Sequence, residues 1–232
     1  MIPPGRGGAF VADMEHVLSV YAEPYDPLRP VVSFDERPCV LHGDTRDPLP
    51  MRPGADARQD HEYVRGGTCC AMLAFEPLTA RRRIWVLPRR RRVEFAEVVR
   101  QLCDEVYPEA ERVRLVCDQL NTHGTAAFYE AFAPAEARRL AQKVEFVHTP
   151  VHGSWLNVVE CEFSALVRQC LGHRRLGTVE AWVERPRRGS RGRGVGREAQ
   201  RRWGDGRLAV HDRGRAGEAA AALPVTMTLS ED

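Results

Sequence analysis

Apolar residues recur along the first three quarters of the chain in two alternating kinds of block. Short runs rich in valine and aromatic residues, bounded by proline, glycine or aspartate, predict strands. They cover residues 30–41, 63–78, 81–88, 112–117 and 144–150. Stretches with helical spacing of their apolar residues predict helices. They cover residues 10–22, 93–108, 125–143 and 154–171, the third interrupted near Pro134.

The order of these blocks predicts an α/β fold. The first three strands follow one another, the second and third separated by a short turn, which favours antiparallel pairing and a β-hairpin. From residue 93 onward helices and strands alternate, which favours parallel additions to the same sheet. Residues 42–62 are rich in glycine, proline and aspartate and predict a loop. The sequence therefore predicts a mixed sheet flanked by helices.

Composition narrows the class of protein. The chain has 232 residues, 43% of them hydrophobic, enough for one domain with its own core. No apolar stretch approaches the ~20 residues of a membrane span, and no signal-peptide core follows Met1. We therefore expect a cytoplasmic protein without a membrane partner. The seven cysteines contain no CxxC pair, which favours buried free thiols over disulfides or a zinc site.

Acidic residues form the candidate site. Asp35 and Asp118 lie within or at the end of separate predicted strands, and Glu160 and Glu162 lie on the last predicted helix. Carboxylates from three elements that meet at one sheet edge repel one another unless cations neutralise them, and hard oxygen ligands suit Mg²⁺ or Mn²⁺. Two such ions can stabilise the attacking and the leaving oxygen when a nucleophile displaces a group at phosphorus. The competing interpretation is that these acids are scattered over the surface and solvated.

Periodicity leaves two details open. Glu160 and Glu162 flank the apolar stripe of their helix on opposite sides, so the pattern alone does not choose between them. Glu36 follows Asp35, and adjacent strand residues point to opposite faces, so one of this pair should face away from the site.

Three motifs carry a resemblance to a known family. SFDERP, VCDQLNTH and HTPVHGSWLNVVE resemble the catalytic domain of bacterial insertion-sequence DDE transposases of the mariner-related superfamily. The resemblance implies an RNase H-like fold with a catalytic, metal-binding triad of Asp35, Asp118 and Glu160, which holds two Mg²⁺ or Mn²⁺ ions. Glu160 is chosen over Glu162 only because it stands three residues after Asn157. The activity implied is metal-dependent DNA cleavage and strand transfer in transposition.

Further residues are candidates for contact with DNA. His123, five residues after Asp118, matches a family histidine that would position substrate or water; alternatively it closes a polar turn. Arg89 and Arg90 stand in an arginine-rich segment suited to phosphate contact or to a solvated strand edge. Trp155 would stack on a base or pack in the core. Asn157 is the last member of the HGSWLN motif and is assigned to the DNA-binding group with them.

The two ends of the chain depart from the family pattern. We expect a helical lead-in over residues 1–29, the catalytic domain over 30–178 and an Arg/Gly-rich tail over 179–232. Relatives end in a segment like VDWRFTT, whose GC-rich codons, read in a shifted frame, give the GRLAVHD found at Gly206–Asp212. The tail is therefore expected to be frameshifted and disordered. Relatives also carry a helix-turn-helix region that reads transposon ends, here expected to be separately encoded or lost.

The resemblance implies transposon ends and target DNA as partners and leaves a homodimer open. Two other functions compete with an active transposase. One is an inactive remnant that folds and keeps the acids, since the chain is expected to be truncated and Gln119 replaces the asparagine that usually follows the second aspartate. The other is an RNase H-like nuclease that cuts DNA without strand transfer.

Overall fold

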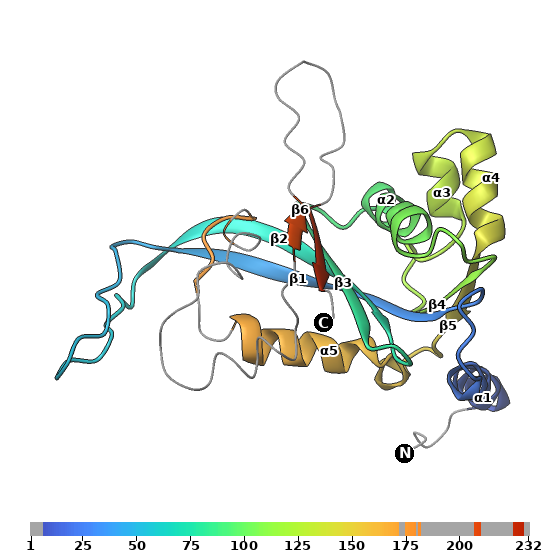
Figure 1. The fold of residues 1–232 in the computed structure, drawn as a ribbon, viewed down its shortest axis with the longest axis horizontal. Helices are drawn as coiled ribbons and strands as arrows, with labels where there is room; N and C mark the ends of the chain where they lie inside the picture. The colour runs from blue at the N-terminus through green and yellow to red at the C-terminus, as the bar shows by residue number, and fades with distance from the viewer. Residues whose placement is uncertain (1–6, 172–174, 180, 182–206, 210–224, 230–232) are drawn as a thin grey trace.

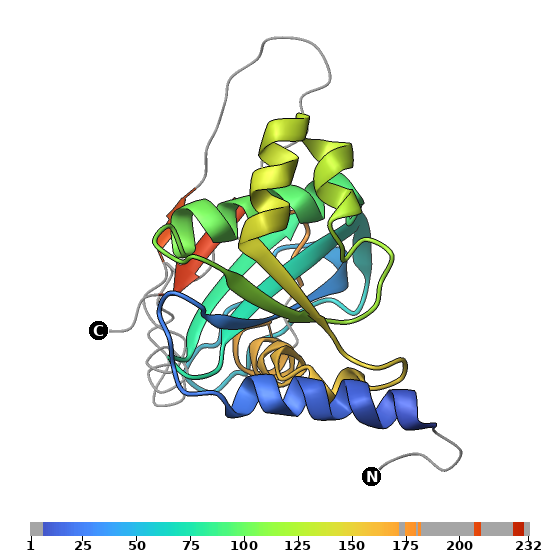
Figure 2. The same cartoon turned by 90° about the vertical axis from the view of Figure 1, so that its right-hand side faces the viewer.

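In the computed structural model the chain forms a mixed sheet covered by helices on both faces (Figures 1 and 2). The structure describes residues 7–171, 175–179, 181, 207–209 and 225–229. The strands are β1 Val31–Asp44, β2 Tyr63–Glu76, β3 Arg81–Leu87, β4 Val113–Cys117, β5 Val144–His148, β6 Arg207–Ala209 and β7 Val225–Leu229. The helices are α1 Gly8–Ala22, α2 Arg92–Gln101, η1 Leu102–Val106, α3 Ala126–Ala131, α4 Pro134–Lys143, η2 Ser154–Leu156, α5 Val159–Ala165 and η3 Leu166–Leu171.

The sheet has the order β5-β4-β1-β2-β3-β7-β6. β1, β2 and β3 form an antiparallel meander, and β4 and β5 add to the other side of β1 in parallel. The antiparallel start and the parallel additions confirm the mixed sheet that the sequence predicts. All five predicted strands are present, and β1 runs three residues beyond its predicted end.

Each face of the sheet has its own apolar core. One core lies under α2, η1, α3 and α4 and includes Val32 and Phe34 of β1. On the opposite face, α1 and η2 pack on Val31 and its neighbours, while α5 and η3 pack on β2 and β3. Figure 2 shows α1 and α5 on one side of the sheet and α2, α3 and α4 on the other. The period-two alternation along β1 therefore distributes its side chains between two helical layers.

Two predicted helices are divided. The break expected near Pro134 is confirmed: α3 ends at Ala131 and Pro134 opens α4, where its missing N–H is not needed. The helix predicted from 154 to 171 begins instead as the short η2, and α5 starts only at Val159. The loop around Asn157 that separates them lies beside the candidate site.

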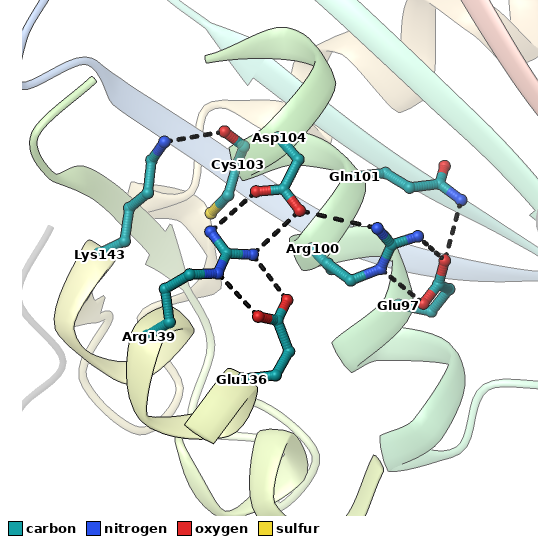
Figure 3. Close-up of polar contacts among 8 residues, drawn as sticks. All are labelled: Glu97, Arg100, Gln101, Cys103, Asp104, Glu136, Arg139 and Lys143. Carbon is teal, nitrogen blue, oxygen red and sulfur yellow. Dashed lines mark hydrogen bonds and ion pairs between the residues drawn. The ribbon is translucent and has the colours of Figure 1, made fainter. Parts of the chain in front are cut away.

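An exposed ionic network joins α2 and η1 to α4 (Figure 3). Arg139 pairs with Asp104 at 2.9 Å and with Glu136 at 2.6 Å, and Arg100 pairs with Glu97 at 2.5 Å. Single exposed pairs contribute little to stability. The network nevertheless links α4, which leads directly into β5, to α2 and η1, which lie over the sheet.

Lys143, at the end of α4, satisfies main-chain carbonyls of the neighbouring segment. Its Nζ donates to the carbonyl oxygens of Cys103 and Pro108 at 3.0 and 2.9 Å (the Cys103 contact is drawn in Figure 3). These carbonyls lie in and just after the π-helix η1, where the regular helical ladder ends. The contact fixes α4 against η1 independently of the ion pairs.

Two segments of the tail form strands in the sheet. Residues 225–229 form β7, which pairs antiparallel with β3, and residues 207–209 form β6 beside it. An edge strand such as β3 offers unpaired backbone groups to any extended segment, and VTMTL is rich in β-branched residues. The structure thus gives these two segments a place in the sheet, and the disorder expected of the tail stays a prediction. Most of the remaining tail lies outside the described residues, and the frameshift stays a prediction.

Within the part of the chain that the structure describes, no helix is long and apolar enough to cross a membrane.

The packing of α5 on the sheet predicts a difference between two leucines. Leu73 of β2 is fully buried in the α5 core, whereas Leu78 in the β2–β3 turn is 54% exposed. Leu73→Ala should lower the free energy of unfolding by about 2–5 kcal/mol, and Leu78→Ala should change it by less than about 0.5 kcal/mol. Urea denaturation followed by circular dichroism measures both. Equal losses in the two variants would contradict this placement of α5.

Candidate active site

Asp35 and Glu36 lie side by side on β1 and point to opposite faces of the sheet. Asp35 is opposite Leu73, which belongs to the core under α5, and Glu36 is opposite Met72, which belongs to the core under α2. Residues directly opposite in an antiparallel pair share a face. The prediction that one of the two acids faces away is therefore confirmed, and Asp35 is the one on the α5 face.

Asp118 directly follows β4, the parallel neighbour of β1. The last paired residues of the two strands are Ser33 and Val116, and Asp35 and Asp118 each stand two positions further on. Burial, followed by repulsion from the Asp118 and Glu36 carboxylates, raises the pKa of Asp35 to about 7, against the opposing effect of a hydrogen bond from the Glu36 main chain. The structure therefore brings the first two predicted catalytic acids together.

His123 links Asp118 to Glu36. Its Nδ1 lies 2.7 Å from Asp118 Oδ1 and its Nε2 lies 2.7 Å from Glu36 Oε2. Burial alone would lower the pKa of His123, but the hydrogen bonds to these carboxylates and to Cys117 raise it to about 12. Placed between two carboxylates, the protonated ring donates from both nitrogens. The same contact lowers the pKa of Asp118 below its usual value.

These bonds decide between the alternatives for His123. Its main-chain N–H donates to Leu120 O at 2.8 Å, so the residue does close a turn. Its side chain is fully buried, and both ring nitrogens are engaged by carboxylates. A ring in this state has no nitrogen left to hold a water molecule or a substrate group, so the predicted direct contact with substrate is corrected to a contact with the two acids.

Glu160 lies on the first turn of α5 and is exposed. The start of this helix is tied to β1 by Asn157, whose Nδ2 donates to Phe34 O at 2.9 Å. Phe34 directly precedes Asp35, so the anchor brings the start of α5 beside the first acid, on the same face of the sheet. Asn157 is only 2% exposed. Its predicted contact with DNA is therefore corrected to a structural contact with the main chain of β1.

The two glutamates of α5 have different surroundings. Glu162 forms an ion pair with Arg82 of β3, with distances of 2.5 and 3.3 Å. No hydrogen bond or ion pair from the described residues engages the Glu160 carboxylate. Among those residues, no three acidic, histidine or cysteine side chains are already arranged to hold a metal ion. The structure thus joins Asp35 and Asp118 but leaves the Glu160 side chain apart from them.

The remaining candidates lie on the surface. Arg89 and Arg90 are exposed between β3 and α2, and Arg90 Nη1 is 3.9 Å from Glu36 Oε1. Trp155 is 52% exposed on η2, so the interpretation of Trp155 as a core residue is wrong. Exposed arginines and an exposed indole beside an acidic site are suited to contact with a polyanion that has stacking bases.

Glu36 is the residue that sequence reasoning missed as part of the site. Its side chain is 4% exposed, and its contact with His123 spans 87 positions of the chain. Strand alternation places Glu36 away from Asp35, but no local pattern identifies its distant partner.

Comparison with known proteins shows the family and the fold of the chain. Residues 30–182 match the family model of the DDE superfamily endonucleases. No curated protein sequence matches the chain significantly. Among solved structures, the Mos1 strand transfer complex is similar, with 15% identity, a TM-score of 0.50, and coverage of 75% of this chain and 50% of that one. A Mos1 mariner paired-end complex with Mn has 15% identity and a TM-score of 0.49, covering 78% and 55%.

The chain therefore spans about half the length of the Mos1 chains that it matches. At these identities the likeness concerns the fold alone, which is the RNase H-like fold of the Mos1 catalytic domain. The family match is broader, because it spans about two thirds of the chain, from the start of β1 past the end of η3. The protein belongs to the DDE superfamily endonucleases.

Proposed function

We propose that this chain is the catalytic domain of a mariner-related transposase that cleaves and joins DNA with divalent metal ions. The observation that carries the proposal is the pair of carboxylates at the junction of β1 and β4. Asp35 is largely buried, and its pKa is raised by burial and by the neighbouring charges of Asp118 and Glu36. A protein that holds such a repulsive pair where the parallel pairing of two central strands ends gains by binding a cation there.

The donor atoms fit Mg²⁺ or Mn²⁺. Both hydrogen bonds accepted by Asp118 use Oδ1, from Leu120 N–H and His123, and the bond accepted by Asp35 also uses Oδ1. The Oδ2 atoms of both aspartates thus accept no hydrogen bond from the described residues. Asp35, Asp118 and Glu160 would hold two ions, which when bound supply Lewis-acid polarisation of the phosphodiester and activation of the attacking water or 3′-hydroxyl.

The protein's own residues would position the reactants. The Asn157 anchor holds the first turn of α5 beside β1, and the exposed Glu160 carboxylate would turn toward the aspartates from there. Arg89 and Arg90 would contact backbone phosphates next to the site, and the exposed Trp155 would stack on a base. DNA is the proposed substrate, as transposon end and as target.

Replacement of the paired aspartates should abolish cutting. We expect Asp35→Asn and Asp118→Asn to reduce nicking of supercoiled plasmid in Mg²⁺ or Mn²⁺ by about 100-fold or more, because even outer-shell partners of metal ligands contribute 10–100-fold. Asp104→Asn, in the exposed network of Figure 3, is the matched control and should nick normally. Undiminished nicking by Asp118→Asn would refute its role, and a wild-type chain inert in both metals would indicate an inactive remnant. Nicks without joined products would favour a nuclease.

The two glutamates of α5 should separate function from stability. Glu160→Gln should abolish nicking and leave the unfolding transition in place, because its carboxylate has no partner among the described residues. Glu162→Gln should lower the free energy of unfolding by about 1–3 kcal/mol, since it removes the charge-assisted bonds to Arg82. Thermal denaturation and plasmid nicking of both variants measure this. The reverse pattern, with cutting lost only in Glu162→Gln, would assign the third acid to Glu162.

Asp35 should make the metal-free protein less stable as the pH rises. Its folded-state pKa of about 7 lies above the ordinary 3.8. The folded protein therefore holds the proton more tightly, and stability from this group is lost as the pH rises from about 4 through 7. Asp35→Asn avoids that loss and should raise the free energy of unfolding by about 1–4 kcal/mol at pH 8 but not at pH 4. Denaturation in EDTA tests this, and an effect independent of pH would contradict it.

A further inference from the structure

We propose that Glu36 is a positioning residue that fixes the carboxylate of Asp118 through the His123 ring. The inference rests on the proposed function, because Asp118 is taken as a metal ligand. It concerns a residue on the face of β1 opposite the metal-binding acid Asp35. Glu36 would thus act on the reaction without touching the metal, the DNA or the reacting atoms.

The three side chains form one continuous chain of short hydrogen bonds. Glu36 Oε2 accepts from His123 Nε2 at 2.7 Å, and Asp118 Oδ1 accepts from His123 Nδ1 at 2.7 Å. The main-chain N–H of Leu120 donates to the same Oδ1 at 3.1 Å. Two donors on one oxygen fix the rotation of the Asp118 carboxylate and leave Oδ2 open for a ligand.

Asp118 needs this support because it stands past the end of β4. Its side chain is 42% exposed, whereas those of His123 and Glu36 are 0% and 4% exposed. The His123 ring is packed near Phe34 and Phe95, with centroid distances of 5.7 and 4.8 Å. A buried ring bonded at both nitrogens cannot turn without breaking one of the bonds. The rigid part of the link is therefore the buried end, and the exposed carboxylate takes its orientation from it.

Glu36 supplies the anchor because it belongs to the centre of the sheet. It is paired with Met72 of β2, inside the longest antiparallel ladder of the described fold. Its only other charged partner among the described residues is Arg90, at 3.9 Å. The hydrogen bond to His123 thus ties the loop after β4 to β1, three strand positions beyond the last parallel pair at Ser33 and Val116.

Two other roles for these side chains conflict with the geometry. Glu36 as a third metal ligand would have to leave His123 and cross to the Asp35 face of the sheet. His123 as a general base would need a ring nitrogen that faces the substrate, but carboxylates engage both nitrogens. Second-layer carboxylate–histidine pairs that orient a metal ligand are a recurrent feature of metal sites.

The test measures Mn²⁺ binding directly on the full chain without DNA. Mn²⁺ dissociation constants from electron paramagnetic resonance are compared for the wild type, Glu36→Gln, His123→Asn and the double variant. We expect each single variant to bind Mn²⁺ about 10- to 100-fold more weakly. The double variant should be no weaker than the worse single variant, because both substitutions break the same link. Thermal denaturation in EDTA establishes that each variant is folded.

Glu76→Gln is the matched control, since Glu76 is another buried carboxylate, bonded to Thr79 and Tyr107 at the end of β2. Its Mn²⁺ affinity should equal that of the wild type. Unchanged Mn²⁺ affinity in Glu36→Gln, with weakened binding in Asp118→Asn, would overturn the positioning role and leave the proposed function intact. Additive losses in the double variant would also overturn it. Failure of the wild type to bind Mn²⁺, or equal binding by Asp118→Asn, would overturn both proposals.

Discussion

The parallel pairing of β1 with β4 is the constraint on which the site depends. It fixes Ser33 beside Val116 and so brings Asp35 and Asp118 together at the point where the pairing ends. Two carboxylates held this way repel each other, and burial of Asp35 adds to the cost. The surrounding structure limits that repulsion on one side only, through the imidazolium of His123. At Asp35 the charge of His123 acts only from a distance, and no basic side chain among the described residues forms a hydrogen bond or ion pair with its carboxylate. We therefore propose a divalent ion as the complement to the site.

Much of the fold follows from patterns in the sequence. The alternating and helical periods predict five strands and four helical stretches, and their order predicts the mixed sheet. Asp35 and Asp118 are candidates from the sequence because they lie within or at the end of separate predicted strands, in motifs that resemble those of the family. The same alternation correctly separates Asp35 from Glu36. Local patterns succeed here because strand parity and helix period are properties of consecutive residues.

The contacts that complete the site could not be predicted in this way. Glu36 meets His123 across 87 residues and Asn157 meets Phe34 across 123, and neither distance leaves a periodic signal. The sequence assigns Asn157 and His123 to contact with substrate or DNA through the family resemblance, yet each is buried against a specific partner. In the structure Glu162 differs from Glu160 through its ion pair with Arg82, which belongs to the distant strand β3. Strand β7 joins the sheet through backbone pairing at an edge, which side-chain composition indicates only weakly.

The central claim is that Asp35 and Asp118 share a divalent metal with Glu160. The most direct measurement is the anomalous difference density of a crystal of this chain soaked in Mn²⁺. The account predicts a peak between the Oδ2 atoms of Asp35 and Asp118, about 2 Å from each, with the Glu160 carboxylate turned toward it and Glu36 still bonded to His123. A Mn²⁺ peak away from both aspartates, or none at a concentration that supports DNA cleavage, would contradict it.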